Sequence, residues 1–238
     1  MSPRPASGSP PIENRLLGHL TARSRREFIA QCDRVQLVFG QVLAEPDAPI
    51  RYVYFPETGF VSLLVPADGG AALEVGLIGR EGMLGATLVL GVDSAPLHAL
   101  VQGAGTALRM TAARFRKALA GSAALREVLT RYCYVLLRQV SQTAACTHYH
   151  TVKARLARWL LMTQDRALGA TFHLTQEFLG RMLGARRVGV TEAAGGLQTR
   201  GLIGYRRGEI VVLNRRGLER ASCACYAADK RLYDRTLG

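Results

Sequence analysis

The sequence predicts an α+β fold in which a β-rich half precedes one long helix and a mainly helical C-terminal part. Short β-branched runs separated by Gly, Pro and Asp fill residues 35–110. Residues 122–149 contain neither Gly nor Pro, which permits one uninterrupted helix. Residues 174–213 contain two short amphipathic helical patterns and then two β-rich runs around a turn. These patterns predict a flexible tail over 1–11, a β domain over 12–120, a long helix over 121–150 and a C-terminal domain over 151–238.

The composition suits a packed protein with a polyanionic partner. Hydrophobic residues make up 48% of the chain, enough to form a core. The net charge is +13, and residues 151–238 hold 16 Lys and Arg against 7 Asp and Glu. The first 150 residues hold only 15 against 11. A basic C-terminal third favours nucleic acid or an anionic membrane surface as partner, with a merely solvated Arg-rich surface as the alternative.

The cysteines and the apolar runs indicate a cytoplasmic protein. The five cysteines are scattered, which does not resemble a disulfide framework. No run approaches the ~18 consecutive apolar residues of a membrane span, so we expect no membrane partner. Residues 1–11 are rich in Pro and Ser and lack the apolar segment of a secretory signal.

The β-rich half begins after one or two short helices that we expect within residues 14–32. Its strands are spaced by 8–12 residues, which is typical of a sandwich or barrel. A further short helix is expected at residues 111–119. The expected strands are Val35–Phe39, Tyr52–Phe55, Val61–Val65, Leu73–Ile78 and Ala99–Met110.

The long helix carries a heptad pattern that predicts a dimer seam. Its members alternate by four and three residues, as in helices that pair. They are Leu125, Leu129, Tyr132, Leu136, Gln139 and Thr143. An ordinary core-facing helix is the alternative, although the polar members favour a seam. Another helix is expected over 152–167, with Thr151 as its N-terminal cap.

The segment from Leu174 to Leu213 has the pattern of a DNA-reading head. Thr175 is the expected helix cap, with Gln176 in the first turn, and Gly184-Ala185 is the type of tight turn that joins two crossed helices. A basic helix follows from Arg186 or Arg187. A hairpin with Arg206 and Arg207 at its tip comes next.

These residues suit DNA chemically. The major groove admits one helix, which reads bases with residues near its N-terminus. Arg pairs with guanine and Glu accepts from cytosine. Arg206 and Arg207 are expected to reach phosphates. The predicted contacts are Thr175, Gln176, Arg186, Arg187, Gly189, Thr191, Glu192, Arg206 and Arg207, with Gly189 allowing close approach of the DNA backbone.

With these motifs, the chain from about Ile12 to Leu213 resembles the Crp/Fnr family of transcription regulators. The most specific stretches are residues 78–85 and 174–187. The resemblance implies an antiparallel, jelly-roll-like β-roll that senses an effector, a dimerisation helix and a winged helix-turn-helix. It also implies a homodimer on double-stranded DNA with an inverted repeat, and RNA polymerase as a candidate partner.

The family's cyclic-nucleotide site is degenerate here. Gly79, Arg80, Glu81 and Gly82 match its Gly-Glu turn only loosely. Ala95 and Pro96 stand where the family has the Arg-Ser pair that holds the phosphate, and neither binds an anion. We take these six residues as the effector pocket and expect no cyclic nucleotide, because a lost charge-assisted contact removes much of the affinity.

No cofactor or metal site is expected. The family's iron–sulfur branch needs four cysteines, but Cys32 is the only one before Cys133. No histidine stands out as a haem ligand. Cys223 and Cys225 would lie about 200° apart on a helix, so packing is favoured over a metal, with redox sensing as the functional alternative.

An enzyme is not expected, because no Gly-x-Ser-x-Gly elbow, P-loop or metal-ligand motif is present. A Cys146–His148 or Cys146–His150 pair remains a weak catalytic pattern. The alternative to a DNA-binding regulator is a ligand-sensing module that no longer binds DNA.

Overall fold

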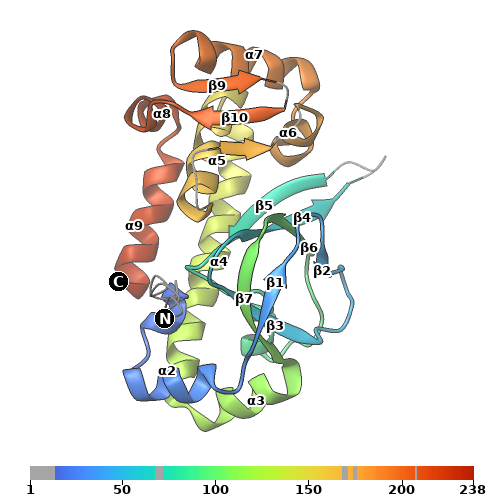
Figure 1. Ribbon diagram of the computed structural model, residues 1–238, viewed down its shortest axis with the longest axis vertical. Helices are drawn as coiled ribbons and strands as arrows, with labels where there is room; N and C mark the ends of the chain where they lie inside the picture. The colour runs from blue at the N-terminus through green and yellow to red at the C-terminus, as the bar shows by residue number, and fades with distance from the viewer. Residues whose placement is uncertain (1–13, 68–71, 168–170, 174–175, 207) are drawn as a thin grey trace, which may run out of the picture.

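A computed structural model of the chain describes residues 14–67, 72–167, 171–173, 176–206 and 208–238. Figure 1 shows a β-roll beside a long helix, α4 (Ala123–Tyr149), and a winged helical head at the far end of that helix. Thr175, Arg207 and the predicted tail over 1–11 lie outside the described residues.

The N-terminal part forms the roll and its helical cover. Its elements are α1 (Arg15–Gly18), α2 (Ala22–Ile29), β1 (Asp33–Leu37), β2 (Val42–Ala44), β3 (Tyr52–Pro56), β4 (Phe60–Pro66), β5 (Ala72–Ile78), the 3-10 helix η2 (Ala86–Leu90), β6 (His98–Gly103), β7 (Gly105–Thr111) and α3 (Ala112–Gly121).

The C-terminal part forms the head and one returning helix. Its elements after α4 are α5 (Val152–Arg166), β8 (Thr171–His173), α6 (Gln176–Leu183), α7 (Arg187–Thr199), β9 (Ile203–Arg206), β10 (Glu209–Val212), α8 (Arg215–Ala221) and α9 (Cys225–Leu237).

The roll consists of two antiparallel sheets with strand orders β1-β7-β3 and β2-β6-β4-β5. Alternate residues of β3 enter two different cores, as the two-residue period of a strand requires. Tyr54 joins the core between the sheets, whereas Val53 and Phe55 join the core beneath the helices. The strand is buried on both faces because helices cover the side of its sheet that would otherwise face water.

The antiparallel sandwich-like domain predicted from the sequence is confirmed, with adjusted strand ends. The expected strand Ala99–Met110 is two strands, β6 and β7, which part at Ala104. Strand β2 and the helices η2, α8 and α9 were not predicted. Three-residue β2 carries too short a pattern to be distinguished from a loop.

Helix α4 begins where the sequence predicts, because the Ser122 hydroxyl accepts a hydrogen bond from the Leu125 amide. The predicted dimer seam, however, is wrong. Leu125, Leu129 and Tyr132 are at most 3% exposed and pack inside the chain against the roll and the N-terminal helices. Their stripe is the face of α4 that enters its own core, which is the alternative that the heptad pattern left open.

The remaining predicted seam positions are only partly exposed. Leu136 is half-buried beside the roll, and Gln139 and Thr143 are half-buried further along α4. Thr143 accepts a hydrogen bond from Arg158 of α5, so it too faces the chain's own interior. The outward face of α4 carries Tyr134, Leu137, Ser141 and Ala144 instead.

Helix α9 does not belong to the C-terminal domain that the sequence predicts over 151–238. It leaves the head and runs back along α4, so its end lies near the first described helix, α1 (Figure 1). Tyr233 and Leu237 are buried in the same core as α1, α2 and the roll. The Tyr233 hydroxyl donates to the Glu81 carbonyl at 2.9 Å. The last helix therefore packs against the β-roll half of the chain.

The head is built around α5, which Thr151 caps as predicted. Leu156, Leu160 and Leu161 are fully buried against residues of α7, α8 and the small sheet of β8, β10 and β9. Trp159 extends from α5 to the roll, where its indole N–H donates to Glu74 of β5 at 2.7 Å. The head is thus packed directly on the four-stranded sheet of the roll.

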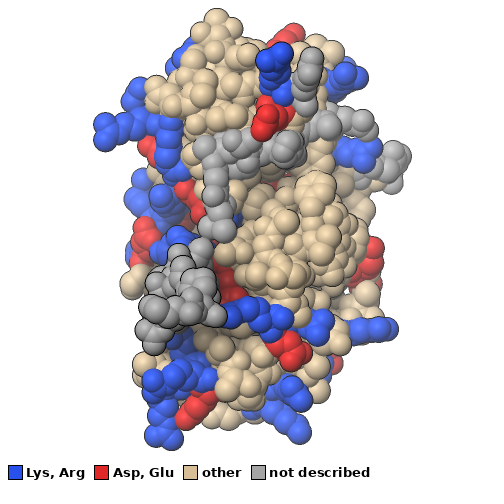
Figure 2. All heavy atoms as spheres, viewed as in Figure 1, with Lys and Arg blue, Asp and Glu red and all other residues tan. Residues whose placement is uncertain are grey.

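Charge is spread over the surface rather than confined to the head. On the face in Figure 2, Lys and Arg gather along the edge formed by α8 and α9 and around the end near α2 and α3. The roll between them is covered mainly by uncharged side chains. Within the described residues, no helix combines the length and apolarity needed to cross a bilayer.

Candidate nucleic-acid interface and ligand cavity

Helices α6 and α7 meet through the turn that the sequence predicts. Gly184 has a left-handed φ of 55°, and the Ala185 amide donates to the Gly180 carbonyl at 2.9 Å. The positive φ favours glycine because an L side chain is strained there. Arg186 then caps α7 with extended backbone, and Arg187 is the first helical residue. The predicted start of the second helix is confirmed.

The interior face of α7 also follows the prediction. Val190, Ala194 and Leu197 are at most 1% exposed and pack into the core of the head. This burial fixes the rotation of the helix and so decides which side chains face outward.

The outward face near the start of α7 carries most of the predicted DNA contacts. Arg186, Arg187, Thr191 and Glu192 are all exposed. Val188 is 68% exposed on the same face and was not among the predicted contacts. The sequence analysis did not consider Val188 because its side chain is apolar. An apolar side chain at the start of a reading helix can, however, contact a thymine methyl group.

Two predicted contacts have a different structural setting. The Thr191 hydroxyl donates to the Gln176 side-chain oxygen at 2.9 Å, which links the first turn of α6 to α7. A Cβ placed on Gly189 would lie 3.8 Å from Val152 of α5. Gly189 is half-buried beside α5, and the close approach of DNA at this position stays a prediction.

The wing is a hairpin of β9 and β10 with Arg206 paired to Glu209 at its tip. Gly208 has a φ of 81°, which closes the tight turn. Arg206 is exposed, as a phosphate contact requires.

A buried arginine, Arg155, stabilises the turn between α6 and α7. The Arg155 guanidinium of α5 donates to the Leu183 carbonyl at the end of α6. That carbonyl is one of the acceptors that a helix end leaves unpaired, so the contact stabilises the point where α6 turns into α7.

The Gly79–Gly82 turn does not form the predicted effector pocket. The Glu81 carboxylate is 2.7 Å from Arg166 of α5, and both side chains are largely buried. A Cβ on Gly79 would approach Arg166 to 2.7 Å, and one on Gly82 would approach the Tyr132 hydroxyl to 2.1 Å. Both glycines are thus required by close packing, and Glu81 is occupied by an ion pair rather than free for a ligand.

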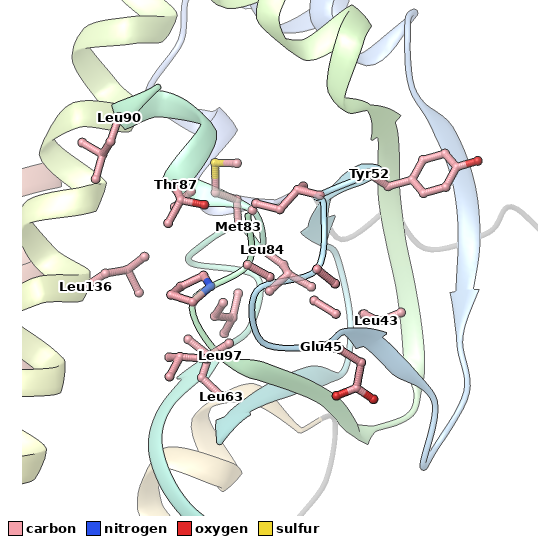
Figure 3. A pocket seen from close by; sticks show the side chains of 18 of the residues that line it. Leu43, Glu45, Tyr52, Leu63, Met83, Leu84, Thr87, Leu90, Leu97 and Leu136 are labelled. Carbon is pink, nitrogen blue, oxygen red and sulfur yellow. The ribbon is translucent and has the colours of Figure 1, made fainter. Parts of the chain in front are cut away.

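Ala95 and Pro96 do line a cavity, of about 660 Å³, between the roll and α4. Figure 3 shows Leu63, Leu84 and Leu97 projecting from the roll and Leu136 projecting from α4. The predicted pocket residues therefore divide between two places. Ala95 and Pro96 belong to the cavity, whereas Arg80 and Glu81 line a smaller hollow against α5 and α9.

Polar groups of the cavity lie at its margin. Figure 3 shows the Tyr52 ring pointing away from the cavity and the Glu45 carboxylate at its edge. Glu45 is paired with His98 at 2.7 Å. Arg51 also lines the cavity but is an exposed residue, and sequence reasoning missed it because it precedes the roll's glycine turn by many residues.

Residues 154–221 match the family model of the Crp-like helix-turn-helix domain. This match ends at α8 and leaves α9 outside, in agreement with the course of the last helix. No curated protein sequence matches the chain significantly.

The fold is similar to those of several solved regulators. FixK2 from Bradyrhizobium japonicum is 21% identical with a TM-score of 0.68, over 81% of this chain and 98% of that one. The c-di-GMP responsive regulator CLP from Xanthomonas campestris is 19% identical with a TM-score of 0.65, over 81% and 99%. TTHB099, a CRP-family regulator from Thermus thermophilus, is 17% identical with a TM-score of 0.66, over 79% and 96%.

The Crp-like helix-turn-helix domain, joined to a β-roll by a long helix, defines a DNA-binding transcription regulator. Residues 154–221 belong to the Crp-like helix-turn-helix family, and the fold of the chain is similar to that of solved Crp/Fnr-family regulators.

Proposed function

We propose that the start of α7 contacts the base edges of an operator and that the wing, the β9–β10 hairpin, contacts the flanking phosphates. The observation that carries the proposal is the exposed set Arg187, Val188, Thr191 and Glu192 on one face of a helix whose opposite face is buried. Arg187 would pair with guanine, Glu192 would accept from cytosine, and Val188 would contact a thymine methyl group. Arg206 would contact phosphate without reading sequence.

The proposed active form is a homodimer, paired through the outward face of α4. Tyr134 and Leu137 are 47% and 64% exposed there, one helical turn apart, and neighbouring exposed apolar side chains can mark a protein contact surface. Ser141 and Ala144 continue the same face at heptad spacing and are small enough for close helix approach. A twofold dimer places two recognition helices about 34 Å apart and so requires an inverted-repeat operator. RNA polymerase is the proposed partner of the bound dimer.

The proposed effector is a mainly apolar small molecule in the cavity between the roll and α4. The cavity's walls are aliphatic, and Ala95 and Pro96 supply no cation for a cyclic phosphate. Pockets of this size bury most of a drug-sized ligand. Leu136, Leu137 and Val140 of α4 also line it, so a ligand would press on the helix that carries the proposed dimer face.

The test of the reading head is a binding-site selection with two matched variants. Arg187→Ala should weaken operator binding by about 1–3 kcal/mol and relax one base position in each half-site. Arg200→Ala removes the same charge at the other, exposed end of α7 and should leave the selected sequence unchanged. An unaltered sequence preference in Arg187→Ala would contradict the assignment of α7 as the reading helix.

A further inference from the structure

Three cysteines and one histidine from two distant parts of the chain meet beside the junction of α4 and α5. Cys146 lies in the last turn of α4 and His150 is the residue that caps it. Cys223 and Cys225 flank the turn from α8 into α9. The three sulfurs and a ring nitrogen all lie within 4.8 Å of one another.

The sequence analysis argued against a metal because Cys223 and Cys225 would point apart on a helix, and the structure shows that this argument does not apply. Cys223 precedes α9 and Cys225 is its first residue, so the pair does not follow helical spacing. The bend between them turns both sulfurs to the same side. His150 caps α4 four residues after Cys146, and its backbone amide donates to the Cys146 carbonyl at 3.2 Å, which keeps the two residues together.

We propose that Cys146, His150, Cys223 and Cys225 form a Zn²⁺ site that fastens the end of α4 to the α8–α9 turn. The Cys146 and Cys223 sulfurs are 3.5 Å apart, and the Cys225 sulfur is 3.7 Å from His150 Nδ1. Zn–S and Zn–N bonds of about 2.3 and 2.0 Å in a tetrahedron give edges of about 3.8 Å between sulfurs and about 3.6 Å between sulfur and nitrogen. The observed separations need little adjustment to accept the ion.

The donor set favours zinc over other metals. Three thiolates and an imidazole are soft or borderline ligands, which Mg²⁺ and Ca²⁺ do not select. Four protein ligands leave no open position, as in structural zinc sites. The ligands of an iron–sulfur cluster are shared among several irons and therefore lie further apart than ligands around one ion.

A neighbouring polar side chain hydrogen-bonds to one of the proposed ligands. The Gln142 amide, one turn before Cys146, donates to the Cys225 sulfur at 3.1 Å. Hydrogen bonds of this kind orient metal ligands. All three cysteines are at most 8% exposed, which protects them from bulk solvent.

Charge at the site is balanced by buried arginines. Zn²⁺ with three thiolates carries one excess negative charge, and the guanidinium groups of Arg155 and Arg158 lie within electrostatic reach of Cys146. The Cys146 and Cys223 sulfurs are 3.5 Å apart, close enough to share a thiol proton, and either sulfur can be the donor. Zinc would replace the thiol protons, which pass to solvent.

The position of the site gives it a structural consequence. It lies where the chain bends from α4 into α5 at His150–Thr151, just before the reading head. It also anchors the start of α9, which continues back to the sensor core. A zinc ion here would hold the bend, the head and the returning helix in one arrangement.

The experiment measures metal in the full-length protein purified without chelators under reducing conditions. We expect about one zinc per chain by elemental analysis, bound by these four ligands. Replacement by Co²⁺ should give the visible bands of tetrahedral cobalt and thiolate-to-metal charge-transfer absorption. Cys223→Ser and Cys225→Ser should each weaken zinc binding at least about 10-fold in competition with a chromophoric chelator.

Two variants make the test specific. Cys133→Ser removes a half-buried thiol of the same helix outside the cluster and should keep zinc. His150→Cys supplies a fourth thiolate and should keep the metal, with a cobalt spectrum shifted toward four sulfur ligands. Circular dichroism of each variant, and zinc titration of chelator-treated wild type, separate loss of the site from loss of the fold.

Several results would overturn the proposal. They are wild-type protein that neither contains nor takes up zinc, a Cys146–Cys223 disulfide in the reduced preparation, and the visible absorption of an iron–sulfur cluster. Zinc that persists undiminished in the Cys223→Ser and Cys225→Ser proteins would place the metal elsewhere.

Discussion

At the scale of single residues, Glu74 is a fully buried carboxyl group with a strongly shifted pKa. It is buried in β5, where it accepts hydrogen bonds from Ser62 at 2.6 Å and from Trp159 at 2.7 Å. Burial raises its pKa from 4.5 to about 7, although both hydrogen bonds oppose the rise. Because Trp159 belongs to the head, this titration occurs at the contact between head and sensor.

The raised pKa predicts how stability depends on pH. Between pH 4.5 and about 7 the folded protein keeps the Glu74 proton that the unfolded chain has lost. The free energy of unfolding therefore falls by up to about 3 kcal/mol as pH rises through this range, and stays reduced above it. Glu74→Gln should flatten this dependence and raise the melting temperature at pH 8.

Melting curves from pH 5 to 8 check the prediction. Gln keeps an oxygen for the Trp159 N–H and offers an amide to Ser62, so the packing is preserved. Glu127→Gln is the matched control, since Glu127 is exposed on α4. Equal pH slopes for Glu74→Gln and wild type would show that Glu74 does not titrate in this range.

At the scale of elements, α4 has two faces with different tasks. Its buried face packs in the sensor core through Leu125, Leu129 and Tyr132. Its exposed face carries Tyr134 and Leu137. The heptad pattern in the sequence correctly identified an apolar face of α4 but assigned it to a second copy of the chain instead of to the chain's own core. A periodic pattern identifies the face of a helix that is covered, but not what covers it.

Leu137→Glu should convert the proposed dimer to monomers. The side chain is 64% exposed within one chain, so the fold should tolerate the charge, whereas a paired seam would bury two carboxylates together. Light scattering at micromolar concentration measures the state, and a mobility-shift titration should show weaker operator binding. Val38→Glu, at a 60% exposed position of the roll, is the control and should stay dimeric. A wild-type monomer that binds its operator tightly would contradict the dimer.

At the scale of the whole molecule, the cavity lies between the β-roll and the long helix α4. One wall is the roll and another is α4, whose other end leads into the head. The head in turn contacts the roll through Trp159 and α6. A ligand in the cavity would thus contact both the roll, which touches the head through Trp159 and α6, and α4, which leads into the head.

The composition of the cavity predicts which ligands stabilise the protein. Cyclic AMP near millimolar concentration should leave the melting temperature unchanged, while the fluorescent apolar probe 1-anilinonaphthalene-8-sulfonate should bind and raise it. Full binding at 100 times the dissociation constant adds about 2.7 kcal/mol, a shift of a few degrees.

Leu97→Trp, which fills the cavity from a half-buried lining position, should abolish probe binding. Val38→Trp on the exposed roll surface should not. A clear rise in melting temperature with cyclic AMP would contradict the assignment of an apolar effector.

The sequence by itself determined the order of the main elements, the extent of the long helix after Ser122, the cap at Thr151, the turn at Gly184 and the basic start of α7. These features depend on neighbours a few residues away, so local chemistry is sufficient to specify them. The family resemblance drawn from them was confirmed by the fold and the matching helix-turn-helix model.

Only the tertiary structure decided which face of α4 turns inward, that Gly189 faces α5, and that Glu81 pairs with Arg166. It alone returned α9 to the sensor core and brought Cys223 and Cys225 to Cys146 and His150. These last contacts join residues some 75 or more positions apart. Such contacts are fixed by how whole elements pack against one another, and a local pattern carries no information about which distant surface will complete it.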